Sequence, residues 1–90
     1  MTDEHIKWIL DFVHNKSQDH KHEHFADSVG DPWGGYTRRG FEITYYPQTN
    51  TYTWEYLLDA EYGGIERDAP FEISEADLIE RLRKDWYPYT

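Results

Sequence analysis

The sequence of 90 residues contains no cysteine, which excludes disulfide bonds and thiolate metal sites and is typical of a cytoplasmic protein. It also has no apolar run close to the roughly 20 residues needed to span a bilayer. The first ten residues, MTDEHIKWIL, lack the basic start and the apolar core of a secretory signal peptide. We therefore expect a soluble cytoplasmic protein that does not bind membranes.

Recognisable catalytic motifs are missing as well. There is no cysteine nucleophile, no glycine-rich phosphate loop and no HExxH motif; His20 and His24 have the spacing of that motif, but the glutamate at its second position is missing. The serines are three, Ser17, Ser28 and Ser74, and the last is expected to cap a helix. Carboxylates are abundant, but nothing in the sequence indicates which of them would be buried with a shifted pKa. The sequence therefore predicts a non-catalytic protein without a cofactor.

Basic residues are scarce relative to acidic ones. The chain has 9 lysine and arginine residues against 18 aspartate and glutamate residues, a formal net charge of −9. Residues 55–77 hold eight of the acids and the single base Arg67. Such an acidic field repels phosphate and anionic membranes, so direct binding of nucleic acid is not expected, whereas a basic protein surface would be attracted. Solubility alone is the alternative explanation of this charge.

Aromatic residues, in contrast, are abundant, with four Trp, eight Tyr and four Phe. The length predicts one small domain over residues 1–90, and its core is thin because a short chain buries a modest share of its surface. Each buried aromatic side chain removes about 150–250 Å² from water and so compensates for the thin core. We expect the larger part of the aromatic side chains to be buried.

Amphipathic patterns predict two helices. The first spans about residues 3–16, where apolar residues recur with helical spacing. Trp8 and Phe12 widen its apolar face, so one row of side chains should cover a neighbouring loop or remain exposed for a partner. The second helix spans about residues 75–86, with Ser74 as its N-cap, acids in its first turn and bases in its last turn.

The segments FEITYY and TYTWEYLL, joined by PQTN, predict a β-hairpin over about residues 41–58. A four-residue loop pairs Tyr46 with Thr51. With that register, one face of the hairpin carries Phe41, Ile43, Tyr45, Tyr52, Trp54 and Tyr56. A row of apolar and aromatic side chains on one face predicts that this face is covered.

Glycines at 63 and 64 signal a tight turn, so residues 65–69 are predicted to fold back as a third strand. Residues 17–40 show no periodicity and are predicted to form a long loop. The element order is then α-β-β-β-α. The sequence thus predicts an α+β domain with an antiparallel meander sheet and both helices packed on one face of it.

The aromatic residues left over from the core exceed what a thin surface normally carries, and Tyr and Trp are enriched at binding hot spots. The candidate binding residues are Trp8, Trp33, Tyr36, Tyr62, Glu61, Glu66 and Asp68. We therefore predict a small acidic protein-binding module, a regulator or inhibitor that engages a basic protein surface. In one variant the carboxylates of residues 55–77 imitate the phosphates of a nucleic acid. The oligomeric state stays open.

The stretch DHKHEH, residues 19–24, suggests an alternative function. In an extended chain His20, His22 and His24 would share one face, and Asp19 or His14 would complete a shell for zinc, nickel or copper. Histidines with pKa values of about 6.5 would instead gain charge together in mild acid. Because Lys21 adds repulsion and the neighbours form a predicted loop, we rank a solvated loop first, a pH-responsive patch second and a metal site third.

Overall fold

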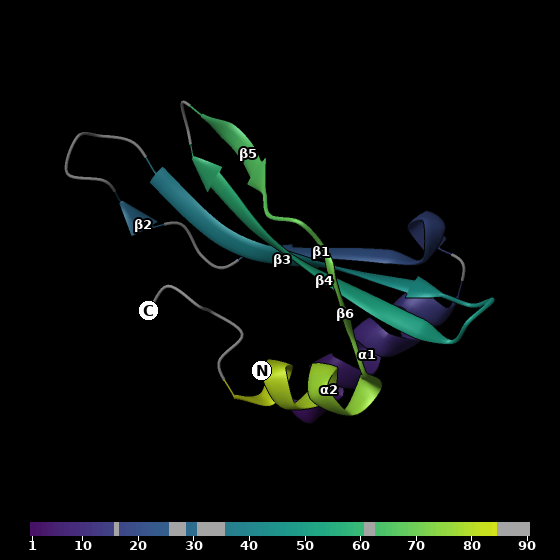
Figure 1. Ribbon diagram of the computed structural model, residues 1–90. Helices are drawn as coiled ribbons and strands as arrows, with labels where there is room; N and C mark the ends of the chain where they lie inside the picture. Colours follow the sequence, from purple (N-terminus) through teal and green to yellow (C-terminus); the bar gives the residue numbers. More distant parts are fainter. Residues whose placement is uncertain (16, 26–28, 31–35, 61–62, 85–90) are drawn as a thin grey trace.

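The computed structural model describes residues 1–15, 17–25, 29–30, 36–60 and 63–84 (Figure 1). Two α-helices, α1 (Asp3–His14) and α2 (Glu75–Arg83), and a 3₁₀ turn, η1 (Ser17–His20), accompany a six-stranded sheet. The strands are β1 (Lys21–Phe25), β2 (Val29–Gly30), β3 (Tyr36–Tyr46), β4 (Thr51–Ala60), β5 (Gly64–Arg67) and β6 (Phe71–Ile73). The predicted α+β class is confirmed.

The hairpin of β3 and β4 forms the centre of the sheet and has the predicted register. Tyr46 pairs with Thr51 beside the turn, and Ile43 pairs with Trp54. The rings of Phe41 and Trp54 stack with their centroids 4.4 Å apart, and both side chains are fully buried. Because neighbouring side chains alternate between faces, a shift of one residue between the two strands would place these rings on opposite faces and break the stack.

Both helices cover this aromatic face, as predicted (Figure 1). α1 contributes Ile6, Ile9 and Val13 to the core, and α2 contributes Leu78 and Leu82; all five side chains are buried. The core therefore lies between the two helices and one face of the sheet. The helices expected over 3–16 and 75–86 end at residues 14 and 83, while residues 16, 85 and 86 lie outside the described part of the chain.

The prediction of one long loop over residues 17–40 is wrong, because β1, β2 and the start of β3 lie in this range. β1 pairs with β3 along its whole length. Its inward positions hold His22 and His24 where a half-buried strand usually has apolar residues, so the sequence shows no apolar alternation. The strand forms because β3, distant in the sequence, supplies an edge to pair with.

The third strand, predicted at 65–69, is present as β5 (Gly64–Arg67), and a further strand, β6, follows it on the same edge of β4. Pro70 lies between β5 and β6, where it has no backbone N–H to donate to a sheet. β6 has three residues, too few for a periodic pattern to reveal it in the sequence. On this side the sheet thus ends in a short edge strand directly before α2.

The face of the sheet away from the helices carries a row of three glutamates, Glu23, Glu42 and Glu55, on β1, β3 and β4. Arg67 of β5 lies 2.8 Å from Glu55, 3.5 Å from Glu42 and 3.4 Å from Glu23. One guanidinium therefore offsets the repulsion among three aligned carboxylates. Glu42 and Glu55 are direct partners across β3 and β4 on this face.

Gly40 is predicted to be essential for the pairing of β1 with β3. A Cβ atom at this position would lie 2.2 Å from the carbonyl oxygen of His24 and 2.7 Å from Cδ1 of Phe25, so Gly40→Ala forces the strands apart. We expect it to lower the free energy of unfolding by about 2–3 kcal/mol in urea denaturation. Gly64→Ala is the control: no atom crowds its Cβ, and its φ of 71° alone should cost about 1 kcal/mol. An equal loss of stability in Gly40→Ala and Gly64→Ala would contradict the close approach of β1 to Gly40 of β3.

Candidate functional site

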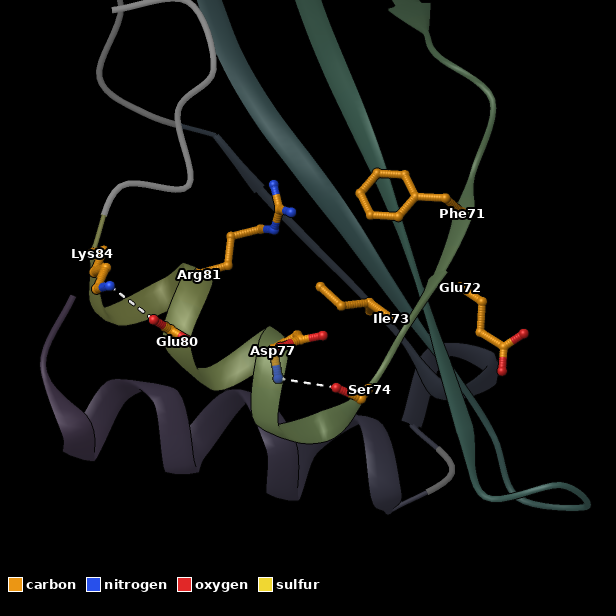
Figure 2. Close-up of a pocket in the computed structure, with 8 residues that line it drawn as sticks. All are labelled: Phe71, Glu72, Ile73, Ser74, Asp77, Glu80, Arg81 and Lys84. Carbon is orange, nitrogen blue, oxygen red and sulfur yellow. Dashed lines mark hydrogen bonds and ion pairs between the residues drawn. The ribbon is translucent and has the colours of Figure 1, made fainter.

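A groove of about 480 Å³ lies between β6 and α2 (Figure 2). One wall is the edge strand β6, residues 71–73. The other is a single face of α2, formed by residues at helical spacing: Asp77, Glu80, Arg81 and Lys84. The volume lies within the range of about 300–1,000 Å³ that is usual for ligand pockets.

The two walls diverge at Ser74, which ends β6 and caps α2. Its backbone is extended, with φ −72° and ψ 157°, and its hydroxyl oxygen accepts a hydrogen bond of 3.1 Å from the backbone N–H of Asp77 (Figure 2). The N-cap predicted from the sequence is therefore present. Because one residue separates strand from helix, the groove is built from a continuous segment of fewer than 15 residues.

Arg81 anchors the groove to the core. Its guanidinium carbon lies 5.5 Å from the ring centres of Trp54 and Phe71, and its Nη1 donates a hydrogen bond to the hydroxyl of Tyr56. These contacts place the cation over aromatic faces, an arrangement that stabilises it when it is partly removed from water. Arg81 is thus held in place by the protein, whereas Phe71 beside it remains 39% exposed.

The groove carries an excess of negative charge. The ammonium of Lys84 lies 2.8 Å from a carboxylate oxygen of Glu80 one turn earlier (Figure 2). This bond lowers the pKa of Glu80 and raises the pKa of Lys84. Among the described residues, neither Glu72 nor Asp77 has an ion-pair partner. The carboxylate of Asp77 in the groove and that of Glu72 on the outer side of β6 are therefore available to a cation from outside.

A chain of hydrogen bonds holds α2 to the sheet and to α1. Tyr52 of β4 donates from its hydroxyl to a carboxylate oxygen of Glu75 at 3.0 Å, and Nε2 of His14 lies 2.6 Å from the same hydroxyl. Since the tyrosine proton goes to the carboxylate, His14 must be the donor of the second bond. Burial and then the bond to Glu75 raise the pKa of Tyr52, so it stays protonated. The start of α2 is thereby fixed beside β4.

The histidines of DHKHEH do not form the expected row. Asp19 and His20 have left-handed backbone conformations, with φ of 58° and 62°, so the chain is not extended there. Nδ1 of His20 bonds to the carbonyl oxygen of Val13, 2.7 Å away. Within the residues described, no group of three or more His, Asp or Glu side chains could hold a metal ion, which removes the geometry on which the metal interpretation rested.

His22 and His24, on the helix-facing side of β1, pack against α1. The ring of His22 makes edge contacts with Trp8 and Phe12, at centroid distances of 5.5 Å and 5.6 Å. Burial, followed by the neighbouring charges of His24 and His5, lowers the pKa of His22 to about 4, and burial also lowers that of His24. The expectation that these histidines gain charge together near pH 6.5 is therefore wrong for His22 and His24.

Of the residues proposed from the sequence as a protein-binding surface, those that the structure describes do not lie together. Trp8 is 52% exposed on α1, where it stacks on Phe12 and covers β1. Glu66 on β5 and Asp68 after it are exposed near the other end of the sheet. Tyr36 is the first residue of β3, opposite Gly30. Trp33, Glu61 and Tyr62 lie outside the described residues.

The groove residues were missed because each had a structural explanation in the sequence. Asp77, Glu80 and Lys84 read as the polar face of an ordinary surface helix, and Glu72 belongs to a strand too short to recognise. The one usable signal was the excess of acids over residues 55–77, which includes Glu72 and Asp77. Acidic character was therefore predictable, whereas the groove was not.

Comparisons with known proteins identify no relative: no protein-family model matches the chain, and no significant match was found among curated proteins or among solved structures. No helix in the described part of the chain combines the length and the apolar content needed to cross a membrane. The chemistry of the groove is thus the basis for assigning a function.

The stability of the protein should depend on pH through His22. The folded state keeps this ring neutral down to about pH 4, whereas the unfolded chain binds a proton near the ordinary pKa of 6.5. Stability is therefore complete above pH 6.5 and falls as the pH is lowered toward 4. The full shift corresponds to about 3 kcal/mol, and because the ring is half exposed we expect about 1–2 kcal/mol.

Urea denaturation at pH 7 and pH 4.5 measures this effect. His22→Leu keeps the contact with Trp8 and removes the titrating group, so it should lose less stability than the original protein over this interval. Identical losses in the two proteins would show that His22 is not buried against α1.

Arg81 should contribute more to stability than the other arginine in the last turns of α2. Arg81→Ala removes the contacts with three aromatic rings and the bond to Tyr56, and we expect it to lower the free energy of unfolding by about 1–2 kcal/mol. Arg83→Ala removes an exposed ion pair with Asp3 and should cost at most about 0.5 kcal/mol. Chemical denaturation followed by tryptophan fluorescence would measure both; a smaller effect at Arg81 would refute its anchoring role.

Proposed function

We propose that this protein is a small, non-catalytic binding module that engages a basic segment of another protein in the groove between β6 and α2. The observation that carries the proposal is the position of two carboxylates that have no ion-pair partner among the described residues: Asp77 lies in the groove, and Glu72 lies beside it on the outer side of β6, next to the exposed ring of Phe71. Cationic and apolar side chains of one partner segment would find complementary surfaces there. A cytoplasmic location is part of this proposal.

The charge of the whole chain supports the same partner. A formal net charge of −9 attracts basic proteins over a distance of about a Debye length and raises the rate of encounter. At the groove, Lys84 is paired with Glu80, whereas Arg81 packs on aromatic rings and has no carboxylate partner among the described residues. An acidic segment would therefore meet two carboxylates and one guanidinium, that of Arg81, which is held against the core.

The variant in which the protein imitates a nucleic acid is less well supported. Its best candidate surface is the row of Glu23, Glu42 and Glu55 on the outer face of the sheet. Arg67 lies within 3.5 Å of all three and reduces the charge of the row. Glu72 and Asp77 have no ion-pair partner among the described residues, so the groove and the adjoining edge of β6 are the better site for a basic partner.

A display library of random 12-residue peptides tests the proposal. Peptides selected on the immobilised protein should be enriched in lysine and arginine. The double variant Glu72→Lys/Asp77→Lys should lose at least about tenfold in affinity for them. Surface substitutions of this kind usually change stability by about 0.5 kcal/mol or less, and thermal melts would confirm that the variant is folded.

The matched control is Glu4→Lys/Asp11→Lys on α1. It changes the net charge by the same amount, and Glu4, like Asp77, is an acid in the first turn of a helix. This control should keep most of the affinity. Equal losses in the two double variants would mean that the acids act only through the overall charge, and peptides without basic enrichment would refute the proposed function.

A further inference from the structure

The edge of the sheet beside the groove is open. Within the described residues β6 pairs with β4 and with no other strand, so its second edge lacks a partner. Unpaired backbone N–H and C=O groups on an edge strand form a template on which another extended chain can pair. Such an edge next to a helix is one of the recurring ways in which proteins bind peptides.

The hydrogen-bond pattern identifies which residue faces the open edge. Successive residues of an antiparallel strand direct their N–H and C=O groups to opposite sides. The N–H of Asp68 donates to the carbonyl oxygen of Tyr56 at 3.1 Å, so the backbone N–H and C=O groups of Tyr56 point to the β5–β6 side of β4. By alternation, the backbone groups of Trp54 and Tyr52 point to the same side. Their partners on β6 are residues 71 and 73, whose backbone groups therefore point to β4.

Glu72, between those two residues, consequently points its backbone N–H and C=O away from the sheet. Its side chain is on the face opposite to the helices, because it pairs with Thr53 and not with the inward Tyr52 or Trp54. Figure 2 shows this alternation: Phe71 and Ile73 lie on the side of α2, and Glu72 points the other way. An added strand could therefore form backbone hydrogen bonds with Glu72 and also contact the Glu72 carboxylate.

From this geometry we propose that the partner segment binds as an added antiparallel strand on β6, with a lysine or arginine directly opposite Glu72 and apolar residues on either side of it. The inference rests on the proposed function and specifies its mode. The basic side chain lies beside the Glu72 carboxylate, a cross-strand pair of opposite charge. Its two neighbours point into the groove, one toward the exposed ring of Phe71 and both toward α2.

Antiparallel pairing follows from the rest of the sheet. Every strand pair described in this protein is antiparallel, and that ladder is slightly more stable for each residue than a parallel one. In such a pair, the backbone N–H of the residue opposite Glu72 donates to the carbonyl oxygen of Glu72. The carbonyl oxygen of that residue accepts from the N–H of Glu72. The adjacent residues of the added strand direct their own N–H groups away from β6.

The first test uses the acetylated and amidated peptide Lys-Val-Lys-Val-Lys and two copies of it with one N-methyl group each. Methylation of the central lysine nitrogen removes the donor to Glu72 and should weaken binding at least about tenfold. Methylation of the valine nitrogen that follows leaves both bonds intact and should change the affinity less than about threefold. In the ¹⁵N-labelled protein, the Glu72 amide should exchange quickly when free and become protected when the parent peptide binds.

The second test fixes the register. The protein variant Glu72→Lys should bind the parent peptide weakly, and a peptide with glutamate as its central residue should recover about tenfold in affinity toward that variant. The recovery also shows that the variant is folded. A central glutamate that binds Glu72→Lys no better than the central lysine would overturn the placement of the basic residue opposite Glu72.

The outcomes separate the two proposals. If the parent peptide binds, and Glu72→Lys/Asp77→Lys abolishes binding, but both methylated peptides bind equally well, the added strand is refuted while the basic-segment function stands. If methylation of the valine is the harmful change, the antiparallel arrangement is refuted. If the parent peptide does not bind and selected peptides are not basic, the proposed function fails and the inference fails with it.

Discussion

The stacked rings of Phe41 and Trp54 are the contact on which the rest of the structure depends. Their centroids lie 4.4 Å apart, both are fully buried, and they come from the two strands of the central hairpin. A shift of one residue in that hairpin would send one ring to the solvent face. The apolar side chains of α1 and α2 pack on the same surface, and Arg81 places its guanidinium 5.5 Å from the Trp54 ring. The core and the groove therefore both depend on the position of the Trp54 ring.

The groove exists because several short-range constraints act in sequence. Pro70 separates β5 from β6, three residues then pair with β4, and Ser74 turns the chain into α2. Hydrogen bonds from Tyr52 to Glu75 and from Arg83 to Asp3 hold α2 against the sheet and α1. The helix therefore lies close enough to the edge strand to form a second wall, while one edge of β6 stays open to a partner.

Histidine explains the main error of sequence-based reasoning. His22 and His24 fill inward positions of β1 that an apolar residue usually takes, and their pKa values are lowered because the rings are half-buried. A neutral imidazole can pack as an aromatic ring, but hydropathy patterns count it as polar. The strand was therefore predicted as part of a loop. The expected row of three histidines is absent for a different reason, since the backbone turns at Asp19 and His20.

By itself, the sequence determined the hairpin register, the two helices, the N-cap of α2 and the acidic character, because each depends on neighbours within about 15 residues. Only the tertiary structure decided that β1 joins β3, that Arg67 lies among Glu23, Glu42 and Glu55, and that β6 is an open edge beside α2. These features depend on which distant segments meet, and no local pattern encodes that choice. Two acidic residues that the sequence assigned to a solvated surface thus lie at and beside a groove, without an ion-pair partner among the described residues.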